Sequence, residues 1–258
     1  MNIVDHCTGK EITAVIPTIN HKQPMTQRLL SELESLGSDW ICIEDSGPGF
    51  NFSKSMNRGI EFALKRESVK FIILSNDDLH TIIGFEGMIN TLKEEKYGYV
   101  CPYLNGKFHA VHLSRSLLVD VMSAAVAGRA PFYVLRQRRA AKKYISSSRY
   151  PIVSQKVFPI GRYAVQVQPF SIFKAEILEK DKFDEDFLKH RQDGELAIRL
   201  YLKGVNGMTS KDWNVTHLNH VSFNLNPNEK NEESYRLDQR AKDMAIFAEK
   251  YKNVRTRG

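Results

Sequence analysis

The sequence lacks a long hydrophobic run, a cysteine framework and a signal-like start, and each absence excludes a class of protein. None of its apolar runs approaches the ~20 residues that cross a bilayer. No basic region followed by an apolar core opens the chain, so we expect no secretion signal. The three cysteines, Cys7, Cys42 and Cys101, are widely spaced and odd in number, which fits neither a disulfide framework nor a zinc site. A reduced, cytoplasmic setting is therefore expected.

What is present is typical of a soluble globular protein. The chain has 258 residues, of which 42% are hydrophobic and 26% charged. This length suits one large α/β domain or two small ones. Because we find no internal repeat and no long low-complexity linker, we expect a single domain over residues 1–258.

Strand-like and helix-like segments alternate along the first 101 residues. Apolar runs predict strands at 11–18, 40–45, 70–76 and 97–103. Apolar residues at helical spacing between them predict three helices, the second capped by Ser53. Such alternation is typical of an α/β fold with a mainly parallel sheet flanked by helices. Ligands bind beyond the carboxyl ends of the strands in such sheets.

The first three predicted strands end in polar residues: Thr18, Asp45, and Asp77 with Asp78. The last pair ends "FIILSNDD", a run whose continuous apolar character predicts burial on both faces. Two adjacent carboxylates repel each other and serve no packing purpose. We therefore expect a positive partner there: a lysine, a helix end or a metal ion.

The second half is less regular. We expect a short helix near 117–127, a strand at 165–173 and a helix that starts at Asp193. A polar strand or loop at 212–223 follows. The last segment predicts an amphipathic closing helix, because its apolar residues are spaced by four, three, four and three: Leu237, Ala241, Met244, Ala248 and Tyr251.

Six short motifs, in order, resemble the family-two glycosyltransferases of the GT-A fold, particularly rhamnosyltransferase-like members. They are "AVIPT", "IEDSG", "MNRGIEFAL", "IILSNDD", "FSIFKAEILEKDKFDEDFL" and "RQDGELAIRLYLKG". The resemblance implies one GT-A (Rossmann-like) domain with a nucleotide-sugar-binding half at 11–101, a variable basic segment at 102–165, an acceptor and catalytic half at 166–223 and a closing helix at 231–251.

The activity that the resemblance implies is metal-dependent, inverting sugar transfer. The donor would be a nucleotide-diphospho-sugar, and the acceptor a hydroxyl on a glycan, glycolipid or glycoprotein. Mn²⁺ or Mg²⁺ would bridge the donor phosphates, because divalent cations of this kind prefer carboxylate oxygens and neutralise charge on the leaving group.

The metal ligands implied are Asp78, the last residue of the Asp-x-Asp-type motif, and His217 in "THLNH", with His220 as a weaker candidate. Asp77 would lie nearer the ribose or the sugar. Other interpretations stay open, since aspartates often cap a following helix. A lone histidine is commonly a hydrogen-bonded structural residue.

Three further residues are implied to bind the donor: Asp45 the nucleobase or ribose, with Thr18 and Asn57 nearby. The alternative for Asp45 is an Asx turn in "EDSGPG". Asn57 in "MNRGI" could simply belong to the interior of a helix.

Asp193 is the implied general base, and its alternative role is a helix N-cap. A helix N-terminus favours its ionised form, which predicts low basicity. Gln192 stands where the family usually has glutamate, and an amide is no base. Glu195 is the only other nearby carboxylate on the predicted helix.

The net charge of +7 is concentrated in one segment. Residues 129–150 hold seven basic residues and no acidic one, which leaves 30 basic and 30 acidic residues elsewhere. This segment favours an anionic partner. We expect peripheral contact with an anionic membrane. Nucleic acid bound with help from Tyr133 and Tyr144 is a less favoured alternative, as is a solvated loop. The competing overall function is a non-catalytic binding module: an inactive relative or a nucleic-acid-binding protein.

Overall fold

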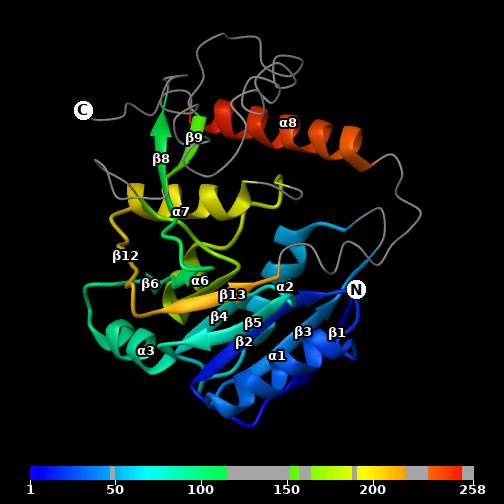
Figure 1. The fold of residues 1–258 in the computed structure, drawn as a ribbon, viewed down its shortest axis with the longest axis vertical. Coiled ribbons are helices and arrows are strands. Elements are labelled where there is room, and N and C mark those ends of the chain that lie inside the picture. The colour runs from blue at the N-terminus through cyan, green and yellow to red at the C-terminus, as the bar shows by residue number, and fades with distance from the viewer. Residues whose placement is uncertain (47–49, 115–151, 157–163, 188–190, 219–231, 252–258) are drawn as a thin grey trace.

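A computed structural model describes residues 1–46, 50–114, 152–156, 164–187, 191–218 and 232–251. Its centre is a seven-stranded sheet with the strand order β1-β3-β2-β4-β11-β6-β12 (Figure 1). These strands span Asn2–His6 (β1), Ile12–Thr18 (β2), Asp39–Glu44 (β3), Phe71–Ser75 (β4), Tyr99–Val100 (β6), Phe170–Lys174 (β11) and Gly207–Met208 (β12).

The sheet is mixed rather than mainly parallel. β3, β2 and β4 are parallel neighbours, so their carboxyl ends meet at one edge. β11 returns from the second half of the chain and pairs antiparallel with both β4 and β6. The predicted first three strands are confirmed. The fourth is shorter than expected, and the antiparallel edge strand β1 was not predicted.

Helices cover both faces of this sheet. Alternate residues of each strand point to opposite faces, and because the strand residues on both faces are apolar, each face is buried under helices. Val15 and Leu74 pack with helix α2 (Phe52–Leu64), whereas Ala14 and Ile73 pack with α1 (Pro24–Ser35) and α3 (Phe85–Lys93). The run that ends in Leu74 is thus buried on both faces, as predicted.

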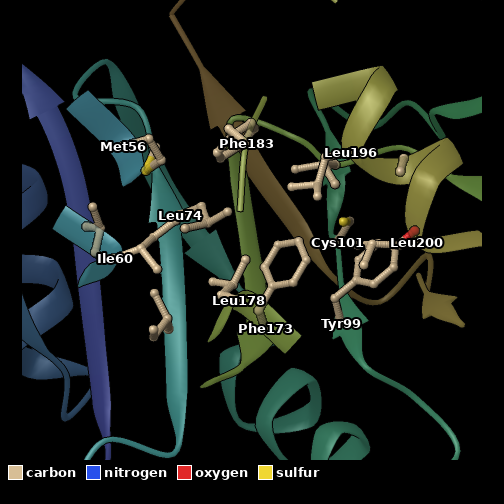
Figure 2. Close-up of a cluster of buried hydrophobic side chains, with 14 of the residues drawn as sticks. Met56, Ile60, Leu74, Tyr99, Cys101, Phe173, Leu178, Phe183, Leu196 and Leu200 are labelled. Carbon is tan, nitrogen blue, oxygen red and sulfur yellow. The ribbon is translucent and has the colours of Figure 1, made fainter. Parts of the chain in front are cut away.

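Helices α6 (Ala175–Lys180) and α7 (Gln192–Leu202) lie on the α2 side of the core. Figure 2 shows Leu196 and Leu200 of α7 beside the rings of Tyr99 and Phe173. Those two rings are stacked, with centroids 5.0 Å apart. Both leucines are fully buried, and burying such a side chain contributes about 1.5–3 kcal/mol. This packing fixes the axis of α7.

Gly59 allows α2 to lie close to the sheet. A Cβ at this position would be 2.3 Å from Val15 Cγ1 and 3.1 Å from Ile43 Cγ1. α2 therefore approaches β2 and β3 more closely than any residue with a side chain would permit. Its N-cap is Asn51, whose side chain accepts from the Lys54 backbone N–H, so the prediction that Ser53 caps this helix was wrong.

Two three-stranded sheets complete the described chain, with the orders β10-β8-β9 and β5-β13-β7. Their strands are β8 (Ala110–Ser114), β9 (Ile152–Lys156), β10 (Ala164–Val165), β5 (Leu79–Ile83), β7 (Tyr103–Leu104) and β13 (Asn214–His217). α7 contacts β8 and β10. The expected helix at 117–127, the basic segment at 129–150 and His220 lie outside the described residues.

The expected closing helix is confirmed as α8 (Glu232–Lys250), which lies beyond α7 from the central sheet (Figure 1). Ala241, Met244, Ala248 and Tyr251 are buried, as their spacing predicts. Within the part of the chain that the structure describes, no helix has the length and apolar character needed to span a bilayer.

Candidate functional site

The carboxyl ends of β2, β3 and β4 bring the predicted donor residues together. The Thr18 hydroxyl donates to Asp77 Oδ2 over 2.7 Å, and the Asp45 backbone N–H donates to the Thr18 carbonyl over 3.0 Å. Thr18 and Asp77 are buried. The convergence that strand order predicted at this edge is thus present in the fold.

Asp78 meets His217 directly. His217 Nε2 donates to Asp78 Oδ1 over 2.8 Å, and both side chains are largely buried, at 11% and 5% exposure. The contact arises because Leu79 of β5 pairs with His217 of β13, next to a bulge in that ladder. The Leu218 backbone N–H also donates to the Asp78 carbonyl. The Asp78 carboxylate therefore has this histidine as its hydrogen-bond partner, and the metal ion expected beside the two aspartates stays a prediction.

The helix-capping interpretation of Asp77 and Asp78 was wrong. The strand β5 follows Asp78 at once, and the next helix, α3, begins seven residues later with Gly84 as its N-cap. Neither carboxylate therefore serves a helix end.

Asp78 and His217 suit a divalent cation only as a partial set. Their facing atoms are close enough to contact one ion, and carboxylate oxygen with imidazole nitrogen suits Mn²⁺. No group of three or more His, Cys, Asp or Glu side chains that could hold a metal occurs among the described residues. A cation held here would take its remaining ligands from water and from a bound diphosphate, as Mg²⁺ commonly does.

Asp45 is half-buried and accepts from the Ser55 hydroxyl of α2 over 2.7 Å. This bond fixes the carboxylate at the carboxyl end of β3. The alternative Asx turn would close on Gly47, which lies outside the described residues, so that alternative stays open.

Asn57 has a structural task in this fold. Its side-chain amide exchanges two hydrogen bonds with the Phe183 backbone, at 2.8 and 2.9 Å, and a third with Glu185 over 3.0 Å. It therefore fastens the segment between α6 and α7 to helix α2. Its predicted contact with the donor stays a prediction.

Asp193 lies in the first turn of α7, but it is not the N-cap. The helix begins at Gln192, and the residue before it, Arg191, has φ +71°, a left-handed conformation that L-residues rarely adopt. The capping alternative for Asp193 was therefore wrong. Strain of this kind persists where the surrounding structure enforces it, often at active sites.

Burial raises the pKa of the Asp193 carboxyl above its ordinary value of 3.8, against hydrogen bonds from Gln166 and the backbone that lower it. Gln166 Nε2 donates to Asp193 Oδ2 over 2.9 Å. The expectation that the helix terminus would leave this group weakly basic was thus wrong, because loss of water outweighs it. A carboxylate with a raised pKa is a better proton acceptor.

Glu195, the other carboxylate considered as a base, is occupied. It is fully buried and accepts from Arg199 Nε at 3.0 Å, Lys250 Nζ at 2.6 Å and the Tyr251 hydroxyl at 2.9 Å. Two cations and a phenol therefore already occupy this carboxylate, which leaves Asp193 as the candidate base in the first turn of α7. The contacts of Glu195 join α7 to the end of α8.

Asp193 and the aspartate pair belong to the same edge of the central sheet. The antiparallel partner of Ser75 in β11 is Phe170, so the segment 166–169 enters where β4 ends. The Asn76 backbone N–H donates to the Pro169 carbonyl over 2.7 Å. A short piece of chain thus connects Gln166, which binds Asp193, to the turn that carries Asp77 and Asp78.

Sequence reasoning missed Gln166 and Ser55 as parts of this site. A signal for the first exists in "VQVQPF", where two glutamines alternate with apolar residues in a segment that is otherwise buried. Both glutamines are in fact buried, at 3% and 5% exposure for Gln166 and Gln168. Ser55, one helical turn after its helix starts, carries no comparable signal.

Comparisons with known proteins give only distant likenesses. No family model matches the chain, and no curated protein matches it. A crystal structure of A197 from STIV has 13% identity and a TM-score of 0.47, covering 81% of this chain and 85% of that one.

Glucosyl-3-phosphoglycerate synthase from Mycobacterium tuberculosis, in complex with Mn²⁺, uridine diphosphate and glucosyl-3-phosphoglycerate, has 12% identity and a TM-score of 0.41, covering 84% and 75%. A putative glucose-1-phosphate thymidylyltransferase from Bacillus anthracis has 13% identity and a TM-score of 0.37, covering 90% and 96%. Likenesses with TM-scores below 0.5 carry no argument about function, and membership of the family-two glycosyltransferases stays a prediction.

Proposed function

We propose that this chain is a GT-A glycosyltransferase that moves a sugar from a nucleotide-diphospho-sugar to an acceptor hydroxyl on a glycan, glycolipid or glycoprotein, with inversion. The observation that carries the proposal is the meeting of Asp78 with His217 over 2.8 Å at the carboxyl edge of β4. The ordered motifs that resemble family-two enzymes place these same residues in the metal position, and Asp193, with its raised pKa, in the position of the base.

The donor half of the reaction is assigned to the first three strands. Asp45, held by Ser55, accepts hydrogen bonds from the nucleobase or ribose. Asp77, fixed by the Thr18 hydroxyl, accepts from hydroxyls of the ribose or the sugar. Asp78 and His217 would hold Mn²⁺ or Mg²⁺, which supplies charge neutralisation for the departing diphosphate.

Asp193 acts on the acceptor. The acceptor oxygen forms a bond to the anomeric carbon of the sugar while the bond from that carbon to the diphosphate oxygen breaks. The proton of the acceptor hydroxyl passes to Asp193, and the nucleoside diphosphate leaves with the bonding electron pair. A single displacement of this kind inverts the anomeric centre.

The test is binding of nucleotides to the purified chain. A thermal-shift panel of UDP-, GDP- and dTDP-sugars, each with and without Mn²⁺, should show one nucleotide that raises the melting temperature only with metal. Ligand at a hundredfold excess over its dissociation constant adds about 2.7 kcal/mol to the free energy of unfolding. Asp78→Ala should abolish the metal-dependent rise, and circular dichroism should show that the variant still folds although His217 loses its hydrogen-bond partner.

Asp212→Ala is a matched control, because Asp212 is exposed and its carboxylate accepts a hydrogen bond from the Ser210 hydroxyl, away from Asp78 and His217. It should bind nucleotide and Mn²⁺ as the wild type does. Calorimetry that shows unchanged Mn²⁺-dependent nucleotide binding in Asp78→Ala would overturn the metal assignment.

A further inference from the structure

Two buried amide oxygens beside Asp193 have no hydrogen-bond partner among the described residues. They are Gln166 Oε1 and Gln192 Oε1. Gln166 is 3% exposed and donates its amide nitrogen to Asp193, and Gln192, 9% exposed, precedes Asp193 in the first turn of α7. Buried polar atoms in folded proteins almost always have partners, so two such oxygens, one on the residue that contacts Asp193 and one on the residue that precedes it, need an explanation.

Both oxygens accept hydrogen bonds and cannot donate them. The Asp193 carboxylate, which Gln166 contacts, is also an acceptor when ionised. The groups that would satisfy these oxygens are O–H or N–H donors. A sugar ring presents several hydroxyls at close spacing, whereas a phosphate or carboxylate would meet oxygen atoms of like polarity. The chemistry therefore favours a neutral polyol.

The segment that carries Gln166 is well fixed. Gln168 N–H donates to the Ser171 hydroxyl over 2.8 Å, and the Pro169 carbonyl accepts from Asn76 over 2.7 Å. A side chain on so constrained a backbone can hold the carboxylate that it contacts in one orientation. Gln192 occupies the position at which the resembling family usually has glutamate, and its neutral amide avoids a second charge beside Asp193.

We propose that Gln166 is a positioning residue for Asp193 and that the amide oxygens of Gln166 and Gln192 bind hydroxyl groups of a neutral sugar acceptor. This inference rests on the proposed function, because it identifies the acceptor class of the same site. It also makes Gln192 a determinant of acceptor specificity rather than a defect in a catalytic motif.

The positioning role is tested without turnover. Gln166→Met keeps the length of the side chain and removes its amide, and the carboxyl ¹³C NMR titration of Asp193, identified by its loss in Asp193→Asn, reports the pKa. The Gln166 hydrogen bond lowers that pKa, so its removal should move the titration to higher pH. Thr13→Val is the matched control, since Thr13 Oγ1, in β2, is another buried oxygen with no hydrogen-bond partner in the part of the chain that the structure describes, and its removal should leave the titration unchanged.

Gln166→Asn serves as a second variant if Gln166→Met does not fold, because it keeps an amide but shortens its reach. An Asp193 titration that is identical in the folded variant and the wild type would overturn the positioning role.

Sugar binding is tested on the side-chain amide signals of Gln166 and Gln192 in ¹⁵N NMR spectra. The probes are free glucose, galactose, mannose, rhamnose and N-acetylglucosamine, with glucuronate as the acidic counterpart of glucose. At least one neutral sugar should shift both signals, and Gln192→Met should weaken its binding about tenfold, the loss typical of one hydrogen bond. If no neutral sugar moves these signals, or glucuronate binds more tightly than glucose, the acceptor assignment is wrong.

Failure of this inference and failure of the proposed function are distinguishable. Metal-dependent nucleotide binding with unresponsive glutamine signals would overturn only the acceptor assignment. Responsive glutamine signals in a chain that binds no nucleotide with Mn²⁺ would instead overturn the transferase function.

Discussion

The surroundings of two carboxylates, Glu44 and Asp193, shift their pKa values in opposite directions. Hydrogen bonds from His21 and Asn2 hold the pKa of Glu44 at about 2, so this group stays ionised at any working pH. Burial does the reverse at Asp193 and raises its pKa. Groups whose surroundings push their pKa values apart divide into permanent anions and proton acceptors. The raised pKa is what the proposed role of Asp193 as the base requires.

Asp193→Asn separates catalysis from folding. Asparagine has nearly the same shape and can still accept from Gln166, but it cannot take a proton. We expect sugar transfer to fall by ~10²–10⁴-fold, the range for removal of a positioned base, with donor and metal affinity nearly preserved. Steady-state kinetics beside nucleotide calorimetry would measure both. Transfer at close to the wild-type rate would mean that the base is misassigned.

The same substitution has a pH signature in stability. A carboxyl whose pKa is raised on folding binds its proton more tightly in the folded chain than in the unfolded chain. The protonated carboxyl therefore makes its full contribution to the free energy of unfolding below its ordinary pKa of 3.8. That stabilising contribution is lost as the pH rises through the pKa of the folded state. Asp193→Asn should therefore match the wild type in strong acid and gain stability relative to it toward neutral pH. Urea melts across this range would show the crossover, and a variant less stable at neutral pH would contradict it.

Two features at this scale could not be predicted from the sequence. Asp193 was expected to be weakly basic because a helix terminus is visible in sequence, whereas burial depends on what packs above it. The hydrogen bond between Gln166 and Asp193 joins residues 27 positions apart across two elements. Side-chain pairs of this kind are set by tertiary geometry, which local patterns do not encode.

Among the helices, an ionic cluster around the buried Glu195 joins α7 to the C-terminal end of α8. Glu195 in the first turn of α7 receives Lys250 and Tyr251 from the end of α8 and Arg199 from its own helix. Arg199 continues the cluster to Asp181, over 2.8 Å, just after α6. The helix that carries Asp193 is thus held at its N-terminal end by charge and along its length by leucine packing.

We expect Glu195→Gln to destabilise the chain rather than abolish chemistry directly. Glutamine removes the charge that Arg199 and Lys250 share, but Arg199 keeps Asp181 and Lys250 keeps Asp184, so we expect a loss of about 1–3 kcal/mol. Chemical denaturation should register this loss, and proteolysis near α8 should become faster. The exposed Glu179→Gln on α6 is the control and should unfold as the wild type does. An unchanged unfolding free energy in Glu195→Gln would show that the cluster does not fasten α8.

Elements with strong local patterns were predicted well, and those fixed by distant pairing were not. The run at Phe71–Ser75 and the spacing in α8 revealed a buried strand and an amphipathic helix. β5 was missed because its five residues resemble a loop that leads into the next helix. Their strand partner, β13, lies more than 130 positions later in the sequence. β1 was missed for the same reason, since its polar sequence becomes a strand only beside β3.

At the scale of the whole molecule, the described fold leaves the excess positive charge unexplained. Of the 37 basic residues, the seven in 129–150 account for the whole net charge of +7, and this segment lies outside the described residues. Charge spread over a surface mainly aids solubility, whereas a concentrated block attracts an anionic surface. An acceptor carried on a lipid would place such a surface beside the enzyme, so we predict that the block brings the chain to an anionic membrane.

Replacing five of these charges with glutamine tests this prediction: Arg136, Arg138, Arg139, Lys142 and Lys143. Each basic residue near an anionic membrane contributes about 1 kcal/mol, so the binding constant for phosphatidylserine vesicles at low salt, measured by sedimentation, should fall by between about three and four orders of magnitude. Binding to phosphatidylcholine vesicles and to the nucleotide donor should not change. The matched control removes five charges that the structure shows as exposed elsewhere: Lys65, Lys96, Lys107, Lys180 and Lys211. Both variants have the same net charge. If both lose sedimentation equally, only the total charge matters and not its position at 129–150. If neither loses sedimentation, the membrane interpretation is wrong.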